Sequence, residues 1–437
     1  MILCLPSQII NIINYNFIIK VNYIMNQSNH TIKEQGVNNN SSKSLIGKKF
    51  AKLYRWFFYE SESDNDTVLD STILSATILL IAIGIVMVYS ASIAYAFNDP
   101  LIHNQYYYLI RHLLYVVIAL VSAVLVFNIP TNFWYTHAKT IAIIVLVLLI
   151  LVLIPHIGKM HNGAKRWLGF GLLSLQPSEL AKLAVVIYLA QYLCDKQLKL
   201  EKFWQDLTPV LLVIAVCMLL LLLEPDMGSA TVIFIVSLSM LYMAELDARL
   251  IIGLTVIGII GFVLLVLVEP YRIRRVLGFM DPWQDALGKG YQLTHSLLAI
   301  GHGGWFGVGL GNSIEKLFYL PEAHTDFILA IIAEETGVLG IFIIMLLFWL
   351  IFYRGFTVIA NTCKKLNRKF QALLSQGISV WLFAQALVNF GVTIGILPTK
   401  GLTLPFISYG GSSILITSIA LSILLKIDYE NKQIYHI

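Results

Sequence analysis

The sequence predicts an all-α polytopic membrane protein with about ten transmembrane helices and one large extracytoplasmic loop between helices 7 and 8. Three observations lead to this class. Of the 437 residues, 58% are hydrophobic and only 13% are charged, whereas soluble domains contain about 25% charged residues. The mean hydropathy is +0.77. The apolar residues are gathered into segments of roughly the 20 residues that a helix needs to cross a bilayer.

The apolar segments divide the chain into a membrane domain, residues 68–426, and two tails. We expect helices at residues 70–96, 108–127, 138–154, 178–194, 207–223, 227–244, 250–268, 327–352, 375–395 and 412–426. The N-terminal tail, residues 1–67, is polar and is predicted to be largely disordered. Its residues 1–24 allow two interpretations, a start of translation at Met25 and a weak interfacial helix. Residues 427–437 form a short second tail.

The distribution of basic residues places both tails in the cytoplasm, because short cytoplasmic loops carry an excess of lysine and arginine. The loops expected inside hold Lys196, Lys199, Lys202, Arg354, Lys364, Lys365, Arg368 and Lys369. The basic residues that depart from this rule lie in three outer intervals, 155–177, 269–326 and 396–411. Positive charge on the outer face indicates an anionic ligand, and the alternative is that long loops cross the membrane regardless of charge. The net charge of +5 needs no nucleic acid to explain it.

The outer interval 269–326 is the longest polar stretch between two apolar segments, and loops of such length usually carry function. Within it, Asp285 precedes Gly288-Lys289-Gly290, and Gln292 follows. Glycine lets a backbone approach a ligand closely, and a carboxylate at hydrogen-bond distance can deprotonate a sugar hydroxyl. The alternative for Asp285 is a simple turn residue. Pro321-Glu322-Ala323-His324-Thr325-Asp326 is either a cap-and-turn device or a wall of the site.

The outer interval after the third helix contains Arg166-Trp167, which either anchors the chain among lipid headgroups or binds a pyrophosphate. Pro177 is placed where a helix starts. Glu179 and Lys182 share a face of the fourth helix. Because ionisable residues inside a membrane are costly, they are either a mutually satisfied pair or a phosphate-binding cation with a carboxylate that positions it. Asp226 is expected to cap the sixth helix.

The most specific stretch runs from Asn389 to Ser413 and reads N-F-G-V-T-I-G-I-L-P-T-K-G-L-T-L-P-F-I-S-Y-G-G-S-S. Together with Gln-Pro-Ser-Glu at 176–179 and Pro-Glu-Ala-His-Thr-Asp at 321–326, it resembles the signature of the shape, elongation, division and sporulation (SEDS) family. The resemblance extends from about residue 70 to 426. The segments Gly-Tyr-Gln-Leu-Thr and Leu-Gly-Asn-Ser resemble the division branch more than the elongation branch.

This resemblance implies a ten-helix peptidoglycan glycosyltransferase that polymerises lipid II, a lipid-linked disaccharide-pentapeptide, into glycan strands during septal cell-wall synthesis. The family's essential aspartate falls on Asp285, and its conserved carboxylate and cation at the fourth helix fall on Glu179 and Lys182. One departure concerns Ala286, where many relatives have proline, so we expect the loop to be held less rigidly here.

The implied reaction is an inverting transfer in which Asp285 is the general base and polyprenyl pyrophosphate is the leaving group. Cations at Arg166, Lys182 or Arg274 would stabilise the charge that grows on the leaving group. The other residues predicted to bind substrate are Glu179, Gln292, His324, Lys400 and Ser408.

The sequence offers no convincing set of metal ligands, although a divalent cation, Mg or Mn, could share the charge of the pyrophosphate. His324 is expected to be a hydrogen-bonding scaffold residue rather than a metal ligand. The four cysteines show no metal or redox spacing, and we expect no disulfide.

The family further implies the nascent glycan strand, a class B penicillin-binding transpeptidase and other division proteins as partners, in the bacterial inner membrane at the septum. The outer ends of the eighth and ninth helices are the expected contact with the transpeptidase. Two other functions remain open. A lipid II flippase would suit the intramembrane ion pair and the glycine-broken helices, and a non-catalytic scaffold of the division machinery would need no reactive carboxylate. The concentration of charged motifs on one face favours the enzyme, because a transporter site lies near the midplane.

Overall fold

The computed structural model describes residues 69–98, 103–161, 164–170, 173–196, 203–268, 273, 278–288, 290–398 and 401–435. All of them belong to one compact unit, Asn65–Ile437. The predictions for the N-terminal tail, including the two interpretations of residues 1–24, lie outside the described residues.

Each of the ten apolar segments contains a helix. The helices are α3 (Ser71–Asn98), α4 (Tyr107–Phe127), α5 (Thr131–Leu153), α6 (Pro177–Asp195), α7 (Phe203–Leu223), α8 (Met227–Met243), α9 (Ala248–Val268), α12 (Ile328–Tyr353), α14 (Lys369–Thr393) and α15 (Gly411–Tyr435). Between α9 and α12 lies α11 (Tyr291–Gly303), and α12 continues through the π-helix η3 (Arg354–Ile359) into α13 (Ala360–Lys365). The prediction of a helical, multi-pass membrane protein is therefore confirmed.

In the described part of the chain, six helices are long and apolar enough to cross a membrane, namely α3, α4, α5, α12 continued to Lys365, α14 and α15. Three apolar helices are shorter, Leu207–Leu223, Met227–Met243 and Ala248–Leu264. The remaining helix, α6, has 19 residues and includes Glu179 and Lys182. The number of ten crossings stays a prediction.

Two helix starts follow their sequence signals. Pro177 stands at the first position of α6, where its missing N–H costs nothing because the first amides of a helix have no partner. Asp226 precedes α8, and its carboxylate accepts hydrogen bonds from the backbone N–H of Ser229 at 3.1 Å and from the Ser229 hydroxyl at 2.9 Å. The predicted cap is confirmed, because the carboxylate satisfies an amide that the helix leaves unpaired.

A small antiparallel sheet interrupts the helices and was not anticipated. Its strands β1 (Gly158–His161), β2 (Ala164–Phe170) and β3 (Leu173–Leu175) pair in the order β1-β2-β3. The register places Lys159 opposite Trp167 and Leu168 opposite Leu175. The short strands lack the regular alternation of apolar and polar residues that marks a strand in a sequence.

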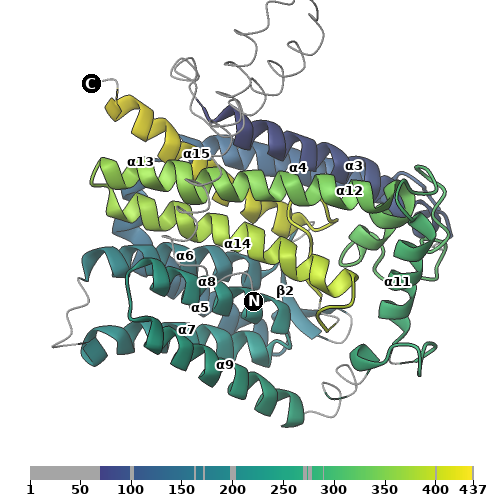
Figure 1. Cartoon of the computed structure of the whole chain (residues 1–437), viewed down its shortest axis with the longest axis horizontal. Coiled ribbons are helices and arrows are strands. Elements are labelled where there is room, and N and C mark those ends of the chain that lie inside the picture. The colour runs from purple at the N-terminus through teal and green to yellow at the C-terminus, as the bar shows by residue number, and fades with distance from the viewer. Residues whose placement is uncertain are drawn as a thin grey trace, which may run out of the picture. The chain divides into compact units, whose positions relative to one another are not determined.

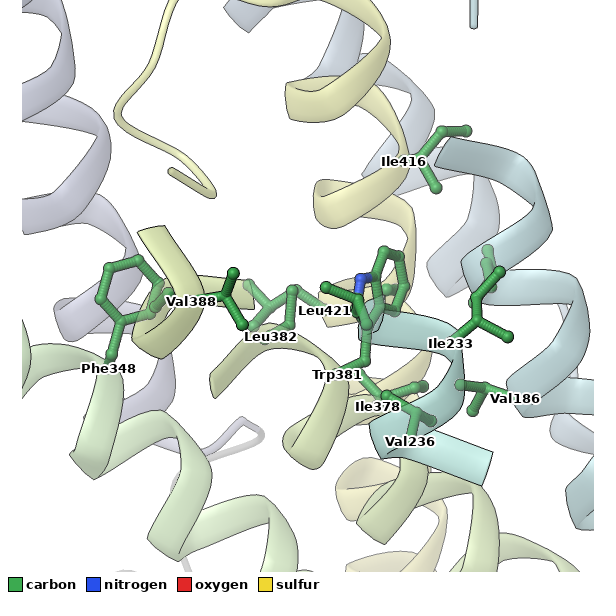
Figure 2. Packing of buried hydrophobic residues seen from close by; sticks show 14 of the residues in the cluster. Val186, Ile233, Val236, Phe348, Ile378, Trp381, Leu382, Val388, Ile416 and Leu421 are labelled. Carbon is green, nitrogen blue, oxygen red and sulfur yellow. The ribbon is translucent and has the colours of Figure 1, made fainter. Parts of the chain in front are cut away.

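The core is centred on α14. In the 18-residue apolar stretch of α14, 83% is buried, compared with 17% in that of α4. Figure 2 shows Trp381 of α14 between Val186 of α6, Ile233 of α8 and Leu421 of α15. Trp381 is fully buried. Because α14 is surrounded by other helices, its polar side chains must find partners inside the protein, and these partners build the site described below.

The two ends of the helix bundle are each held by their own set of side-chain contacts. At one end, Arg368 forms an ion pair with Glu430, and Arg354 donates a 2.7 Å hydrogen bond to Asp70. At the other end lie α11 and the strand β2 (Figure 1). Described residues from all three intervals predicted to be outside meet at this second end, since Gly401 lies beside Asp326 and Arg166.

Candidate active site

Lys182 and Glu179 form a buried ion pair in the first turns of α6. The ammonium nitrogen of Lys182 lies 2.7 Å from Glu179 Oε1 and 2.7 Å from Gln385 Oε1, and the two side chains are 1% and 4% exposed. Trp381 Nε1 donates to the same Gln385 oxygen at 3.0 Å. The predicted pairing is confirmed. Since an ammonium has three donors, these contacts leave one N–H of Lys182 for a further partner.

The part of the signature stretch that follows α14 is connected to this pair through Gln385. Gln385 Nε2 donates to the carbonyl oxygen of Thr403 at 3.0 Å. Asn389 Nδ2 donates to the carbonyl oxygens of Leu402 at 2.6 Å and Asp326 at 2.9 Å. Buried amide side chains of α14 thus hold two loops together, the loop after α14 and the turn before α12.

The start of α15 joins the same loop to α6. The Ser412 hydroxyl accepts a hydrogen bond from the backbone N–H of Gln176 at 3.0 Å and donates to the carbonyl oxygen of Ser174 at 2.9 Å. Ser408, which was predicted to bind substrate, is buried, and its hydroxyl accepts from the backbone N–H of Leu404 at 2.8 Å. Ser408 therefore stabilises a turn, and a contact between Ser408 and substrate stays a prediction.

Arg166 extends from β2 to the turn between α7 and α8. Its Nε donates to the carbonyl oxygen of Glu224 at 3.1 Å, and its Nη2 donates to the carbonyl oxygen of Pro225. A Cβ atom added at Gly401 would lie 2.9 Å from Asp326 Oδ2 and 4.0 Å from Arg166 Nη1. A larger residue at 401 would displace the Asp326 carboxylate at this meeting point of β2, the turn before α12 and the loop after α14.

Glu224 is a buried carboxyl group in the turn between α7 and α8, two residues before the cap residue Asp226. The residue is 1% exposed, and neither carboxyl oxygen has a hydrogen-bond partner among the described residues. Burial raises the pKa of Glu224 to about 8; the neighbouring Asp226 adds to the rise and Arg166 opposes it. The group is therefore mostly protonated at neutral pH.

His324 belongs to an aromatic cluster, which we define as Tyr95, Tyr108, His324 and Tyr409. The centre of the His324 ring lies 4.7 Å from Tyr108, 5.7 Å from Tyr409 and 5.8 Å from Tyr95. The backbone N–H of Tyr409 donates to the carbonyl oxygen of His324 at 3.0 Å. Burial lowers the pKa of His324, with Glu322 opposing the shift. The His324 ring is tilted against the three phenol rings, and its Nδ1 has no hydrogen-bond partner among the described residues. The hydrogen-bonding role of this side chain therefore stays a prediction.

Arg111 stands at the edge of the aromatic cluster. Its guanidinium lies 4.9 Å from the centre of the Tyr107 ring. Burial raises the pKa of Tyr409, and the hydrogen bond from Arg111 to the Tyr409 side chain opposes this rise. Arg111 and the tyrosines of α4 were not among the residues predicted from the sequence to form the site. The signal that could have found them is the run Tyr106-Tyr107-Tyr108 at the start of the second helix.

Asp285 lies on an exposed turn directly before α11. Its backbone carbonyl accepts hydrogen bonds from the N–H groups of Gly288 and Gly290, both at 3.1 Å. A Cβ atom at Gly288 would come within 2.4 Å of Asp285 Oδ1, so the carboxylate lies over this glycine. Gln292 is half-buried in the first turn of α11. The proximity of Asp285 to Lys182 stays a prediction.

Arg274 and Lys400, which were also predicted to bind substrate, lie outside the described residues. Among the described residues, no group of three or more histidine, cysteine, aspartate or glutamate side chains is placed to hold a metal ion. The structure thus brings Arg166, Glu179, Lys182, His324 and Ser408 to one end of the bundle, around the two loops that Asn389 joins.

Helices long enough to cross a membrane, with buried charges and glycine-rich loops at one end, define a multi-pass membrane protein with a polar site at one end of its helices. The chain belongs to the family of cell cycle proteins that comprises FtsW, RodA and SpoVE, whose model matches residues 70–433.

Curated relatives of this chain come from several bacteria. The "probable peptidoglycan glycosyltransferase FtsW" of Burkholderia thailandensis is 46% identical over 83% of this chain and 79% of its own length. The protein of the same description in Nitrosomonas europaea is 45% identical, over 83% of this chain and 94% of its own length.

Solved structures share the fold. A chain of a structure described as "Structural coordination of polymerization and crosslinking by a peptidoglycan synthase complex" superimposes with a TM-score of 0.68, at 29% identity, over 83% of this chain and 98% of that chain. The rod shape determining protein RodA of Thermus thermophilus gives a TM-score of 0.60 at 28% identity, over 84% of this chain and 99% of that chain.

Proposed function

We propose that this protein is a peptidoglycan glycosyltransferase that polymerises lipid II into glycan strands during cell division. The observation that carries the proposal is the similarity over nearly the whole membrane domain to relatives described as probable peptidoglycan glycosyltransferases, at 46% identity for the Burkholderia protein. The site supports it, because basic and amide side chains gather at one end of the helices, where a lipid-borne substrate presents its headgroup.

In the proposed reaction, Asp285 takes the proton of the sugar 4-hydroxyl of an incoming lipid II. The hydroxyl oxygen then attacks the anomeric carbon of the growing strand, a new C–O bond forms with inversion, and the bond to the polyprenyl pyrophosphate breaks. The exposure of Asp285 suits this role, since a general base must reach the acceptor within hydrogen-bond distance.

The leaving pyrophosphate gains negative charge as the bond breaks, and prepositioned donors stabilise such charge. Lys182 supplies a fixed ammonium whose position is set by Glu179 and Gln385. Arg166 is committed to two carbonyl oxygens of the turn after α7, so its proposed contribution is a positive charge near the site rather than a bidentate grip. Arg274 and Lys400 remain proposed substrate ligands.

A divalent cation would be held mainly by the phosphates of the substrate, because Mg²⁺ in such sites commonly binds one or two carboxylates together with substrate phosphates. Asp226 and Asp326 are carboxylates at this end of the bundle, and Gln176 Nε2 lies 3.5 Å from Asp226 Oδ2. The amide and cap contacts of Asp226 favour a structural role for that residue.

The proposed partner is a membrane-embedded class B penicillin-binding transpeptidase in the inner membrane at the septum. The related solved structure is described as part of a peptidoglycan synthase complex. The outer half of α12 exposes Val338, Leu339 and Phe342, which are 39%, 49% and 63% exposed. This apolar stripe at the expected outer end of the eighth helix could accept a transmembrane helix of the partner.

The deciding experiment uses the full-length protein in lipid vesicles with fluorescently labelled lipid II, with and without the transpeptidase. We expect polymer that is resolved as a ladder on a gel. Translocation of lipid II without polymer would replace the proposal with a flippase, and neither activity together with intact partner binding would replace it with a scaffold.

A further inference from the structure

Two neighbouring carboxylates in α12, Glu334 and Glu335, are 0% and 1% exposed. They immediately precede a kink in the helix at Gly337, where φ is 72° and ψ is −172°. Glu335 Oε1 lies 2.7 Å from the ammonium of Lys316 and accepts a 2.6 Å hydrogen bond from the Ser90 hydroxyl of α3. Buried charges in a membrane protein are paired or functional, and these two are paired with the long outer loop.

Glu334 binds the backbone of that loop. Its carboxylate accepts hydrogen bonds from the N–H of Ile314 at 3.1 Å, the N–H of Glu315 at 3.3 Å and the hydroxyl of Ser313. Hydrogen bonds to a charged group are the strong ones. The segment 313–316 is therefore clamped between α12 and α3, and the direction of the Glu315 side chain is set by this clamp.

Glu315 in turn holds α11. Its Oε2 lies 2.7 Å from His295 Nδ1, and the two side chains are 5% and 15% exposed. The ring of His295 is packed between Tyr291, at 4.4 Å between ring centres, and Tyr319, at 6.0 Å. This pair lies one turn after the start of α11, a helix that runs across the end of α12 (Figure 1).

The start of α11 carries the turn with Asp285. The hydroxyl of Thr294 donates to the carbonyl oxygen of Pro282 at 3.0 Å. The N–H of Gly290, which caps α11, donates to the carbonyl oxygen of Asp285 at 3.1 Å. These two bonds close the turn from Pro282 to Gly290 onto the helix, so a rotation or shift of α11 displaces the Asp285 carboxylate by a similar amount.

We propose that Glu315 and His295 are positioning residues for Asp285, which act through α11 and do not touch the substrate. Glu334 fixes Glu315, Glu315 fixes His295, and the helix that contains His295 fixes the turn of the general base. The inference rests on the proposed function, because it assigns these residues to the reaction of Asp285. A misplacement of about 1 Å in a reacting group can lower a rate by about 100-fold, so a hydrogen bond remote from the reacting atoms can control the rate.

The first test compares Glu315→Ala with Glu315→Gln in the polymerisation assay. We expect Glu315→Ala to lower kcat by about 10- to 100-fold while the KM for lipid II stays within about twofold, because the substrate contacts remain. Glu315→Gln should keep most of the activity, since an amide can pair with either tautomer of His295.

Asn312→Ala is the matched control. It lies in the same loop as Glu315, is exposed, and its side chain donates to the carbonyl oxygen of Val308 at 3.2 Å.

The second test measures position directly. Spin labels at Leu287 and Ile396, which are 91% and 66% exposed, would report the distance between the Asp285 turn and the loop after α14 in a variant without native cysteines. We expect a broader distribution in Glu315→Ala than in the parent or in Glu315→Gln. An unchanged distribution, a normal kcat in Glu315→Ala, or a Glu315→Gln variant as slow as Glu315→Ala would overturn the proposal. If the parent makes no polymer, the proposed function fails, while the distances still test whether Glu315 positions α11.

Discussion

The surroundings of Lys182 and of Asp285 differ in how each charge is held. Lys182 is 2% exposed and lies between a carboxylate and an amide on a buried helix. Asp285 is exposed on a turn that is connected to the rest of the protein through α11. A buried, paired charge contributes to both stability and activity, and its removal confuses the two. The removal of an exposed carboxylate on a turn is expected to affect folding less than the removal of a buried charge, so its effect on activity is easier to interpret.

The sharpest test of this contrast is Asp285→Ala. We expect polymerisation to fall by about 10²- to 10⁴-fold, the usual contribution of a general base, while the melting temperature barely changes, because exposed substitutions alter stability by about 0.5 kcal/mol or less. Gln284→Ala, at the exposed neighbouring position of the same turn, is the control and should remain active. Polymer formed at the normal rate by Asp285→Ala would remove this residue from the mechanism.

Lys182→Met should behave differently, with a loss of both activity and stability. The substitution leaves Glu179 buried without its partner, which costs about 3–5 kcal/mol. The double variant Glu179→Gln with Lys182→Met should regain much of the stability and none of the activity. Lys364→Met, at an exposed position, is the control. Thermal unfolding in detergent and the polymerisation assay measure the two effects, and a fully stable Lys182→Met would contradict the structural half of the contrast.

Arg166→Lys addresses an intermediate case, a half-buried cation that stabilises a turn. Lysine cannot reproduce the fork of donors that contacts two carbonyl oxygens. We expect the free energy of unfolding to fall by about 1–2 kcal/mol, below the full value of about 1.5–3 kcal/mol for hydrogen bonds to a charged group because Arg166 is partly exposed. Lys165→Gln, the neighbour in β2, should have no such effect. Equal stability of Arg166→Lys and the parent would show that the turn does not depend on the guanidinium.

The pH dependence of stability tests a buried carboxyl group outside this contrast, Glu224. Because the pKa of this carboxyl rises from the ordinary 4.5 to about 8 in the folded protein, the folded state holds the proton more tightly than the unfolded state. The free energy of unfolding should therefore fall as the pH rises from about 4.5 to about 8 and level off above that. Glu224→Gln should remove this slope, whereas Glu245→Gln, at an exposed turn, should retain it. Melting curves between pH 6 and pH 9 decide the matter.

Local patterns explain why much of the architecture was predictable. The helices follow from runs of apolar residues, the start of α6 from Pro177, and the cap of α8 from Asp226. The pairing of Glu179 with Lys182 follows from their spacing of three residues, since such residues are neighbours on any helix. The sheet was not predictable, because all three strands are short and β1 and β2 contain glycine and several basic residues.

The sequence by itself determined the membrane helices, the face on which charge collects, and the residues eligible to do chemistry. Only the tertiary structure decided which of these residues meet. Gln385 faces Lys182 across 203 positions of sequence, and Arg166 reaches the carbonyl of Glu224 across 58. The hydropathy of a segment is a property of neighbours along the chain, whereas hydrogen bonds between helices depend on how the helices pack, which no single segment encodes.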